Sequence, residues 1–214
     1  SVDLPGWGES QPKAGQDYGP VAQAARLSAF LKTEAPQTAL LVGHSMGGMI
    51  SGLLTAEHPE QVQRIVFMSS AGVAFNENDF ARQVLKGYNP FAEYEADALL
   101  SFMKTYVFAD PPYIPKALIN VIVAQRAAKK EFERTVFTQI RTGPEAFLLQ
   151  QRLPDITQPV GLLWCDQDRI IDPSAAAVFA KGLQRSETRI LSGCGHMPMM
   201  EQPEQVAAFL LSRC

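Results

Sequence analysis

ALLVGHSMGG, residues 39–48, is the stretch around which the rest of this chain is organised. The apolar run Ala39–Val42 has the length and composition of a buried parallel strand, and a weakly helical apolar segment, Met49–Ala56, follows it. The Gly-x-Ser-x-Gly motif between them, residues 43–47, predicts a sharp turn whose glycines, two before and two after the serine, must lack a Cβ atom. We therefore expect the hydroxyl of Ser45 to stand at the tip of the strand.

A serine hydroxyl becomes a useful nucleophile only when a base takes its proton, and the chain offers three histidines. His44 adjoins the serine on the strained turn, so its ring is expected to point elsewhere. His58 precedes a proline at a helix end and is expected to be a surface residue. His196 follows the last expected strand in a glycine-flanked loop, and parallel strands end on one side of a sheet. By elimination, His196 is the predicted base.

A carboxylate must then fix the tautomer of the histidine and stabilise its cation. The loop after Trp164 offers Asp166, Asp168 and Asp172. Asp166 is close enough to the strand end to cap a turn, and Asp172 is placed to cap the following helix. Asp168 is therefore the predicted partner of His196.

Apolar periodicity along the chain alternates between helix and strand, which predicts an α/β fold with a parallel sheet flanked by helices. Beyond the turn already described, the expected strands are Val62–Met68, Val160–Trp164 and Glu187–Leu191, and the expected helices are Tyr18–Ala35, Ser174–Leu183 and Pro203–Leu211.

The middle of the chain carries helical patterns but no clear strand, at Asp79–Leu85, Ala96–Tyr106, Pro115–Ala128 and Glu131–Thr142. We expect residues 1–71 and 152–214 to form the core and residues 72–151 to form a helical lid over the sheet. Aromatic residues recur in this lid, at Phe75, Phe80, Tyr88, Phe91, Tyr94, Phe102, Tyr106, Phe108 and Tyr113. They either pack the lid on the core or line a pocket for an apolar substrate.

Composition excludes several classes of protein. The 214-residue chain has a net charge of −3 and no basic run, so nucleic acid is not an expected partner. No apolar stretch is long enough to span a bilayer, and no signal peptide opens the chain. The three cysteines, Cys165, Cys194 and Cys214, are odd in number and lack metal spacing. They predict reduced thiols, no disulfide framework and no zinc, with a cytoplasm-like setting slightly favoured and the compartment left open.

The chain resembles the α/β-hydrolases, and within that fold the bacterial lipases and esterases related to monoacylglycerol lipases. Four segments carry the resemblance: residues 3–10 (DLPGWGES), 43–48 (GHSMGG), 163–168 (LWCDQD) and 193–196 (GCGH). The order Ser, Asp, His is that of this fold. In such proteins glycine often stands where this chain has Cys165. The motifs are specific for the fold and the triad but only moderately specific for the substrate.

The resemblance implies a serine hydrolase that cleaves carboxylic esters through an acyl-enzyme, with Ser45, His196 and Asp168 as the triad. The backbone N–H of Met46 is the expected oxyanion donor. His44, Met49 and Met197 are candidate substrate-binding residues, although methionines here are equally consistent with plain core packing. No metal or organic cofactor is implied. A carbon–carbon bond hydrolase of the same fold and a non-catalytic binding protein remain as alternatives.

Relatives carry three or four strands, and a loop with a second oxyanion donor, before the segment that matches residues 3–10. We expect the present chain to hold a half-sheet, with the elbow strand as an apolar, uncovered edge. A further N-terminal segment or a companion chain is the expected partner that completes the sheet. Residues 1–8 themselves read as the end of a strand followed by a Pro-Gly turn. Association with a membrane surface is left open.

Overall fold

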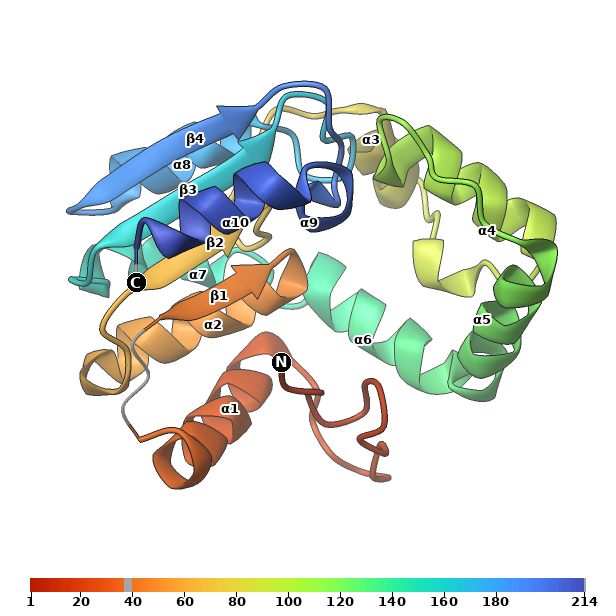
Figure 1. Ribbon diagram of the computed structural model, residues 1–214. Helices are drawn as coiled ribbons and strands as arrows, with labels where there is room; N and C mark the ends of the chain where they lie inside the picture. Colours follow the sequence, from red (N-terminus) through yellow and green to blue (C-terminus); the bar gives the residue numbers. More distant parts are fainter. Residues whose placement is uncertain (37–39, 214) are drawn as a thin grey trace.

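A computed structural model describes residues 1–36 and 40–213. Its centre is a four-stranded parallel sheet in which the strands follow one another in chain order (Figure 1). The strands are β1 (Leu41–His44), β2 (Ile65–Met68), β3 (Val160–Cys165) and β4 (Ser186–Leu191). Each pairs in parallel with the next, for example Val42 with Val66 and Leu163 with Arg189. The predicted parallel sheet is therefore confirmed.

Helices cover the two faces of the sheet unequally. The larger core lies against α2 (Met46–Glu57) and α8 (Ser174–Gly182), with α1 (Pro20–Glu34) packed on α2 (Figure 1). The smaller core lies on the other face, under α10 (Pro203–Leu211), where Phe209 has only 1% of its surface exposed. Alternate residues of β2 and β3 supply the two cores, as the two-residue period of a strand requires.

Burial along the strands follows their place in the sheet. All six residues of β3 are buried, because a neighbouring strand lies on each side and helices lie on both faces. The outer strands are less covered: Val42 in β1 is 40% exposed and Ile190 in β4 is 44% exposed. Within residues 1–36 and 40–213, β1 is thus an edge strand with an apolar residue at its surface.

Every element between β2 and β3 is helical in the described chain. The α-helices are α3 (Asp79–Leu85), α4 (Ala96–Phe102), α5 (Lys116–Ala128), α6 (Lys130–Thr142) and α7 (Leu148–Arg152). A π-helix, Met103–Val107, continues α4, and short 3₁₀ turns lie at Pro90–Ala92 and Leu153–Asp155. A further 3₁₀ turn, Pro59–Gln61, precedes β2. Helices α3 to α6 form an arch beside the carboxyl ends of the strands (Figure 1). The division at residues 72 and 151 stays a prediction, since Leu149 of α7 packs in the main core.

The rings of the insertion pack on one another in two groups. Phe80, Tyr88, Phe102 and Tyr106 form one, with centroids 5.3–6.5 Å apart. In the other, Trp7 of the N-terminal segment meets Phe91 and Phe132 edge to face. This second group attaches the insertion to residues outside it, whereas Tyr113 is 90% exposed.

Several boundaries differ from the sequence expectation. β1 begins two residues later than predicted and includes His44, and Ala39 lies outside the described residues. Residues 1–8 form turns and no strand, since no neighbouring strand is available to pair with them in the described chain. The predicted stretch Val62–Met68 shortens to β2. No helix of the described residues combines the length and apolar character needed to cross a membrane.

Candidate active site

Ser45 sits on a strained turn between β1 and α2. Its φ of 52° and ψ of −123° lie outside the regions that residues with a Cβ usually adopt. Both backbone groups of the residue are nevertheless hydrogen-bonded: its N–H donates to the carbonyl of Met68 (3.1 Å) and its carbonyl accepts from Ala71 (3.0 Å). Strain held by surrounding hydrogen bonds is common at functional sites.

The prediction for the glycines around the turn is confirmed at Gly43 and wrong at Gly47. A Cβ on Gly43 would lie 2.6 Å from the Cα of Gly48 and 2.7 Å from the carbonyl oxygen of Gly47, so this position must be glycine. Gly47 has nothing beyond its own helix within 4 Å of such a Cβ, so the expected crowding there is wrong. Gly48 is the second crowded position, because its Cβ would lie 2.2 Å from the Oγ of Ser70.

Three side chains distant in sequence meet at the carboxyl ends of β1, β3 and β4. The Nε2 of His196 lies 3.1 Å from the Oγ of Ser45. Its Nδ1 lies 3.0 Å from each carboxylate oxygen of Asp168. His196 and Asp168 are 7% and 4% exposed, so water competes little for these contacts. A base oriented by an acid and in reach of a hydroxyl can take its proton.

The three aspartates in the loop after β3 have different hydrogen-bond partners. The Oδ1 of Asp168 also accepts the N–H groups of Ile170 and Ile171, at 3.0 Å each, which fixes the carboxylate. Asp166 accepts from Gly193 (2.8 Å) and so joins this loop to the histidine loop. Asp172 accepts from Ser174 (2.9 Å) at the start of α8, as expected of a helix cap.

His44 does not point away from the site. Its Nε2 lies 2.7 Å from the carbonyl oxygen of His196, so this nitrogen carries the hydrogen and donates it. Burial, and then repulsion by the neighbouring His196, lower the pKa of His44 from 6.5 to about 4. A neutral His44 therefore supports the loop of His196. His58, in contrast, pairs with Glu60 at 3.5 Å, with a third of its side chain exposed.

The methionines named from sequence lie in different surroundings. Met46 is the first residue of α2, where backbone N–H groups have no acceptor within the helix. Met49 has no exposed surface and packs in the main core beside Gly72 and Leu149, which leaves it no side-chain surface for a substrate. Met197 is half-buried at the start of α9 (Pro198–Glu201), next to His196.

Comparison with known families assigns the chain to one of them. The profile described as "Alpha/beta hydrolase family" matches residues 1–209. The chain belongs to that family. Among curated relatives, a monoacylglycerol lipase of Xenopus laevis is 28% identical over 98% of this chain, and lipase 1 of Psychrobacter immobilis is 30% identical over 96%. The chain spans 65% of the length of each of these two relatives.

Solved structures of other proteins show the same fold. A crystal structure described as a membrane phospholipase A, a bacterial virulence factor, is 32% identical with a TM-score of 0.89, and the match covers 98% of this chain and 68% of that one. A 2-hydroxy-6-oxo-6-phenylhexa-2,4-dienoate hydrolase from a Rhodococcus species is 20% identical with a TM-score of 0.78, covering 97% and 76%. The second likeness supports the hydrolase fold alone.

A disulfide joins the loops of Asp168 and His196 in this α/β-hydrolase, so the expectation of reduced thiols is wrong for two cysteines. Cys165 ends β3 and Cys194 follows β4, and their sulfurs are 2.04 Å apart. Parallel pairing of β3 with β4 brings these residues, 29 apart in sequence, within 5.2 Å at their Cα atoms. An odd number of cysteines does not exclude one disulfide between two of them. Cys214 lies outside the described residues.

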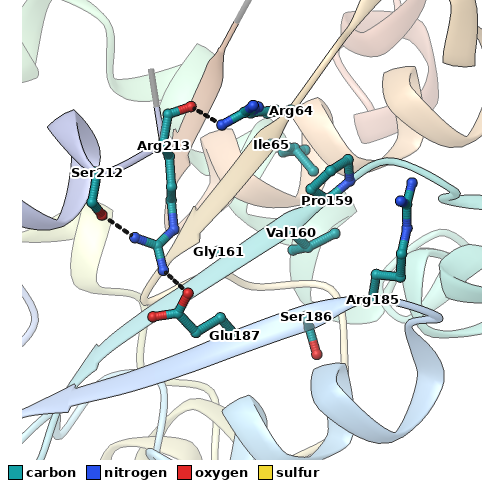
Figure 2. A pocket seen from close by; sticks show the side chains of 10 residues that line it. All are labelled: Arg64, Ile65, Pro159, Val160, Gly161, Arg185, Ser186, Glu187, Ser212 and Arg213. Carbon is teal, nitrogen blue, oxygen red and sulfur yellow. Dashed lines mark hydrogen bonds and ion pairs between the residues drawn. The ribbon is translucent and has the colours of Figure 1, made fainter.

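A hollow of about 390 Å³ opens at the opposite, amino ends of β2, β3 and β4 (Figure 2). Arg213 pairs there with Glu187 at 2.8 Å, and Arg64 donates to the carbonyl of Arg213 at 2.7 Å. Ser45, Asp168 and His196 lie instead at the carboxyl ends of the strands, where ligands bind in open α/β sheets. This hollow is therefore separate from the candidate active site.

Proposed function

We propose that this chain carries the catalytic triad of a serine hydrolase that cleaves carboxylic esters. The observation that carries the proposal is the continuous contact from Ser45 Oγ to His196 Nε2 (3.1 Å) and from His196 Nδ1 to Asp168 (3.0 Å). A buried base needs both contacts, one to the hydroxyl that it deprotonates and one to the group that stabilises its cation.

The reaction follows from these positions. As Ser45 attacks the ester carbonyl, its proton passes to His196, whose cation is stabilised by Asp168. The backbone N–H of Met46, at the start of α2, is the proposed donor to the developing oxyanion. His196 then gives its proton to the departing alcohol, which leaves an acyl-enzyme. Water activated by His196 releases the acid and restores Ser45.

Apolar esters, including monoacylglycerols, are the proposed substrates. Relatives of this chain named as a monoacylglycerol lipase, a lipase and a phospholipase A support an acyl ester. Met197, half-buried beside the base, is the remaining methionine of the sequence prediction with surface to offer to an acyl chain. His44 contributes by supporting the loop of His196, whereas Met49 is buried in the core.

The test is turnover of a short p-nitrophenyl ester by the whole protein and by its Ser45→Ala variant. Removal of the nucleophile should lower kcat by about 10⁶-fold, with an unchanged melting temperature. His58→Ala is the matched control, because that histidine lies outside the site. A Ser45→Ala variant that retains turnover contradicts the serine mechanism.

A carbon–carbon bond hydrolase of the same fold is the second candidate, because the same three side chains serve that reaction. A substrate panel of simple esters, monoacylglycerols and dienoic keto acids separates the two. Preference for the keto acids overturns the ester assignment. Binding of all of them without turnover, seen as shifts in melting temperature, favours a non-catalytic binding protein.

A further inference from the structure

Residues 103–110 of the helical insertion touch both loops that carry the proposed acid and base. The segment begins as the π-helix Met103–Val107, a form that occurs mostly as short pieces at functional sites. On the acid side, Arg169 donates from Nη1 to the carbonyl of Thr105 (3.1 Å). On the base side, the N–H of His196 donates to the carbonyl of Val107 (2.7 Å). The backbone of the base is thus hydrogen-bonded to the insertion.

Glu201, the last residue of α9, also joins the histidine loop to the insertion, through its carboxylate. Its Oε1 accepts the N–H of Gly195 at 2.8 Å, next to the base. Its Oε2 accepts the N–H of Ala109 at 2.8 Å and lies 3.4 Å from that of Asp110. A Cβ on Gly195 would lie 2.7 Å from the carbonyl of Val107, so the two backbones are in close contact here.

We propose that Glu201 is a positioning residue through which the helical insertion holds the imidazole of His196 between Ser45 and Asp168. This inference rests on the function proposed above. Hydrogen bonds to an ionised acceptor are stronger than neutral ones, and here a single carboxylate accepts from both segments. Without it, the N–H groups of Gly195 and Ala109 lose their shared acceptor. The hydrogen bond from His196 to Val107 remains, but the link between the histidine loop and the insertion is weakened.

Glu201→Gln in the whole protein tests this coupling, since an amide in place of the carboxylate can accept at only one of the two sides. The kcat for a short p-nitrophenyl ester should fall by about 10- to 100-fold, because displacing a base by a fraction of an ångström has effects of that order. KM should stay unchanged, because Glu201 is not proposed to touch the substrate. Glu204→Gln, three residues on and exposed, is the matched control with wild-type kinetics expected.

Hydrogen exchange adds a readout that does not depend on turnover. Amides of residues 103–110 and 193–197 should both exchange faster in Glu201→Gln than in the wild type or in Glu204→Gln. Glu201→Asp keeps the charge but shortens the reach, so we expect an intermediate kcat. This variant also serves if Glu201→Gln does not fold.

The outcomes separate this inference from the proposed function. A wild-type kcat in Glu201→Gln, while Ser45→Ala is inactive, overturns the role of Glu201 and leaves the hydrolase standing. If kcat in Glu201→Gln falls only in proportion to the fraction of protein that is folded, Glu201 has a purely structural role, and this result also overturns the proposal. If the wild type cleaves no ester, the proposed function is wrong. Unchanged hydrogen exchange of the two segments in Glu201→Gln then overturns the coupling as well.

Discussion

The imidazoles of His44 and His196 lie against one another, with ring centroids 4.8 Å apart, and His44 donates from Nε2 to the carbonyl oxygen of His196 at 2.7 Å. The residue before the proposed nucleophile therefore fixes the backbone of the proposed base. Burial lowers the pKa of His44, and repulsion between two charged rings this close together lowers it further.

This contact predicts an acid-sensitive stability. The pKa of His44 falls from 6.5 in the unfolded chain to about 4 in the folded one, so between these values the unfolded state binds more protons. The free energy of unfolding must therefore decrease as the pH falls from 6.5 towards 4. Between pH 7 and pH 5 the wild type should lose about 2 kcal/mol more than His44→Gln, which keeps a donor but does not titrate. Urea unfolding at both pH values measures the difference, and equal losses contradict the assignment.

Asp168 and Asp166 provide a matched pair for the acid. Asp168→Asn should lower kcat by about 10⁴-fold, since an amide no longer holds the correct tautomer of the histidine. Asp166→Asn should leave kcat near the wild-type value, because its side-chain oxygen still accepts from Gly193. Steady-state kinetics on a soluble ester compare the two. A larger loss of kcat in Asp166→Asn than in Asp168→Asn contradicts the assignment of the acid to Asp168.

Gly43 and Gly47 provide a matched pair for the turn. Gly43→Ala places a Cβ 2.6 Å from backbone atoms of the next helix, which cannot yield as a flexible side chain does. We expect it to lower the free energy of unfolding by about 3 kcal/mol or to prevent folding. Gly47→Ala meets no neighbour outside its helix and should stabilise α2 by about 0.5–1 kcal/mol. Thermal unfolding of both variants measures these effects, and equal destabilisation rejects the role assigned to Gly43.

The disulfide predicts a covalent link that can be found directly. A non-reduced digest should contain the Cys165 and Cys194 peptides joined, and reduction should separate them. The double variant Cys165→Ala, Cys194→Ala should lower the free energy of unfolding by about 3–4 kcal/mol, the chain-entropy value for closing a loop of 29 residues. Cys214→Ala is the control. Free thiols at both positions in protein prepared without reductant reject the link.

Local patterns were enough to predict most of the fold. The apolar runs predicted four strands and the periodicities predicted α3, α8 and α10 to within a residue, because burial of a strand or of one helix face dictates residue type directly. Ser45, His196 and Asp168 could be chosen from sequence for a related reason. Parallel strands end on one side of a sheet, so chemically suited residues just after such strands are brought together.

Contacts between loops could not be predicted in this way. Gly43 and Gly48 are crowded by atoms whose positions depend on how α2 leaves the turn, and the free space around Gly47 depends on the same path. The Cys165–Cys194 pair was missed because counting cysteines carries no information about the register of β3 and β4. The sequence cannot tell whether Met49 faces a substrate or the core, because a methionine near the turn is compatible with both.

The sequence by itself determined the order of helices and strands and the identity of the three side chains at their ends, because apolar periodicity and the residue type at a strand end are local properties. The tertiary structure alone decided that His44 supports His196, that a disulfide joins the loops of Asp168 and His196, and that Glu201 binds both Gly195 and Ala109. Most of these contacts involve backbone groups, which every residue possesses, so no pattern of side chains could have predicted them.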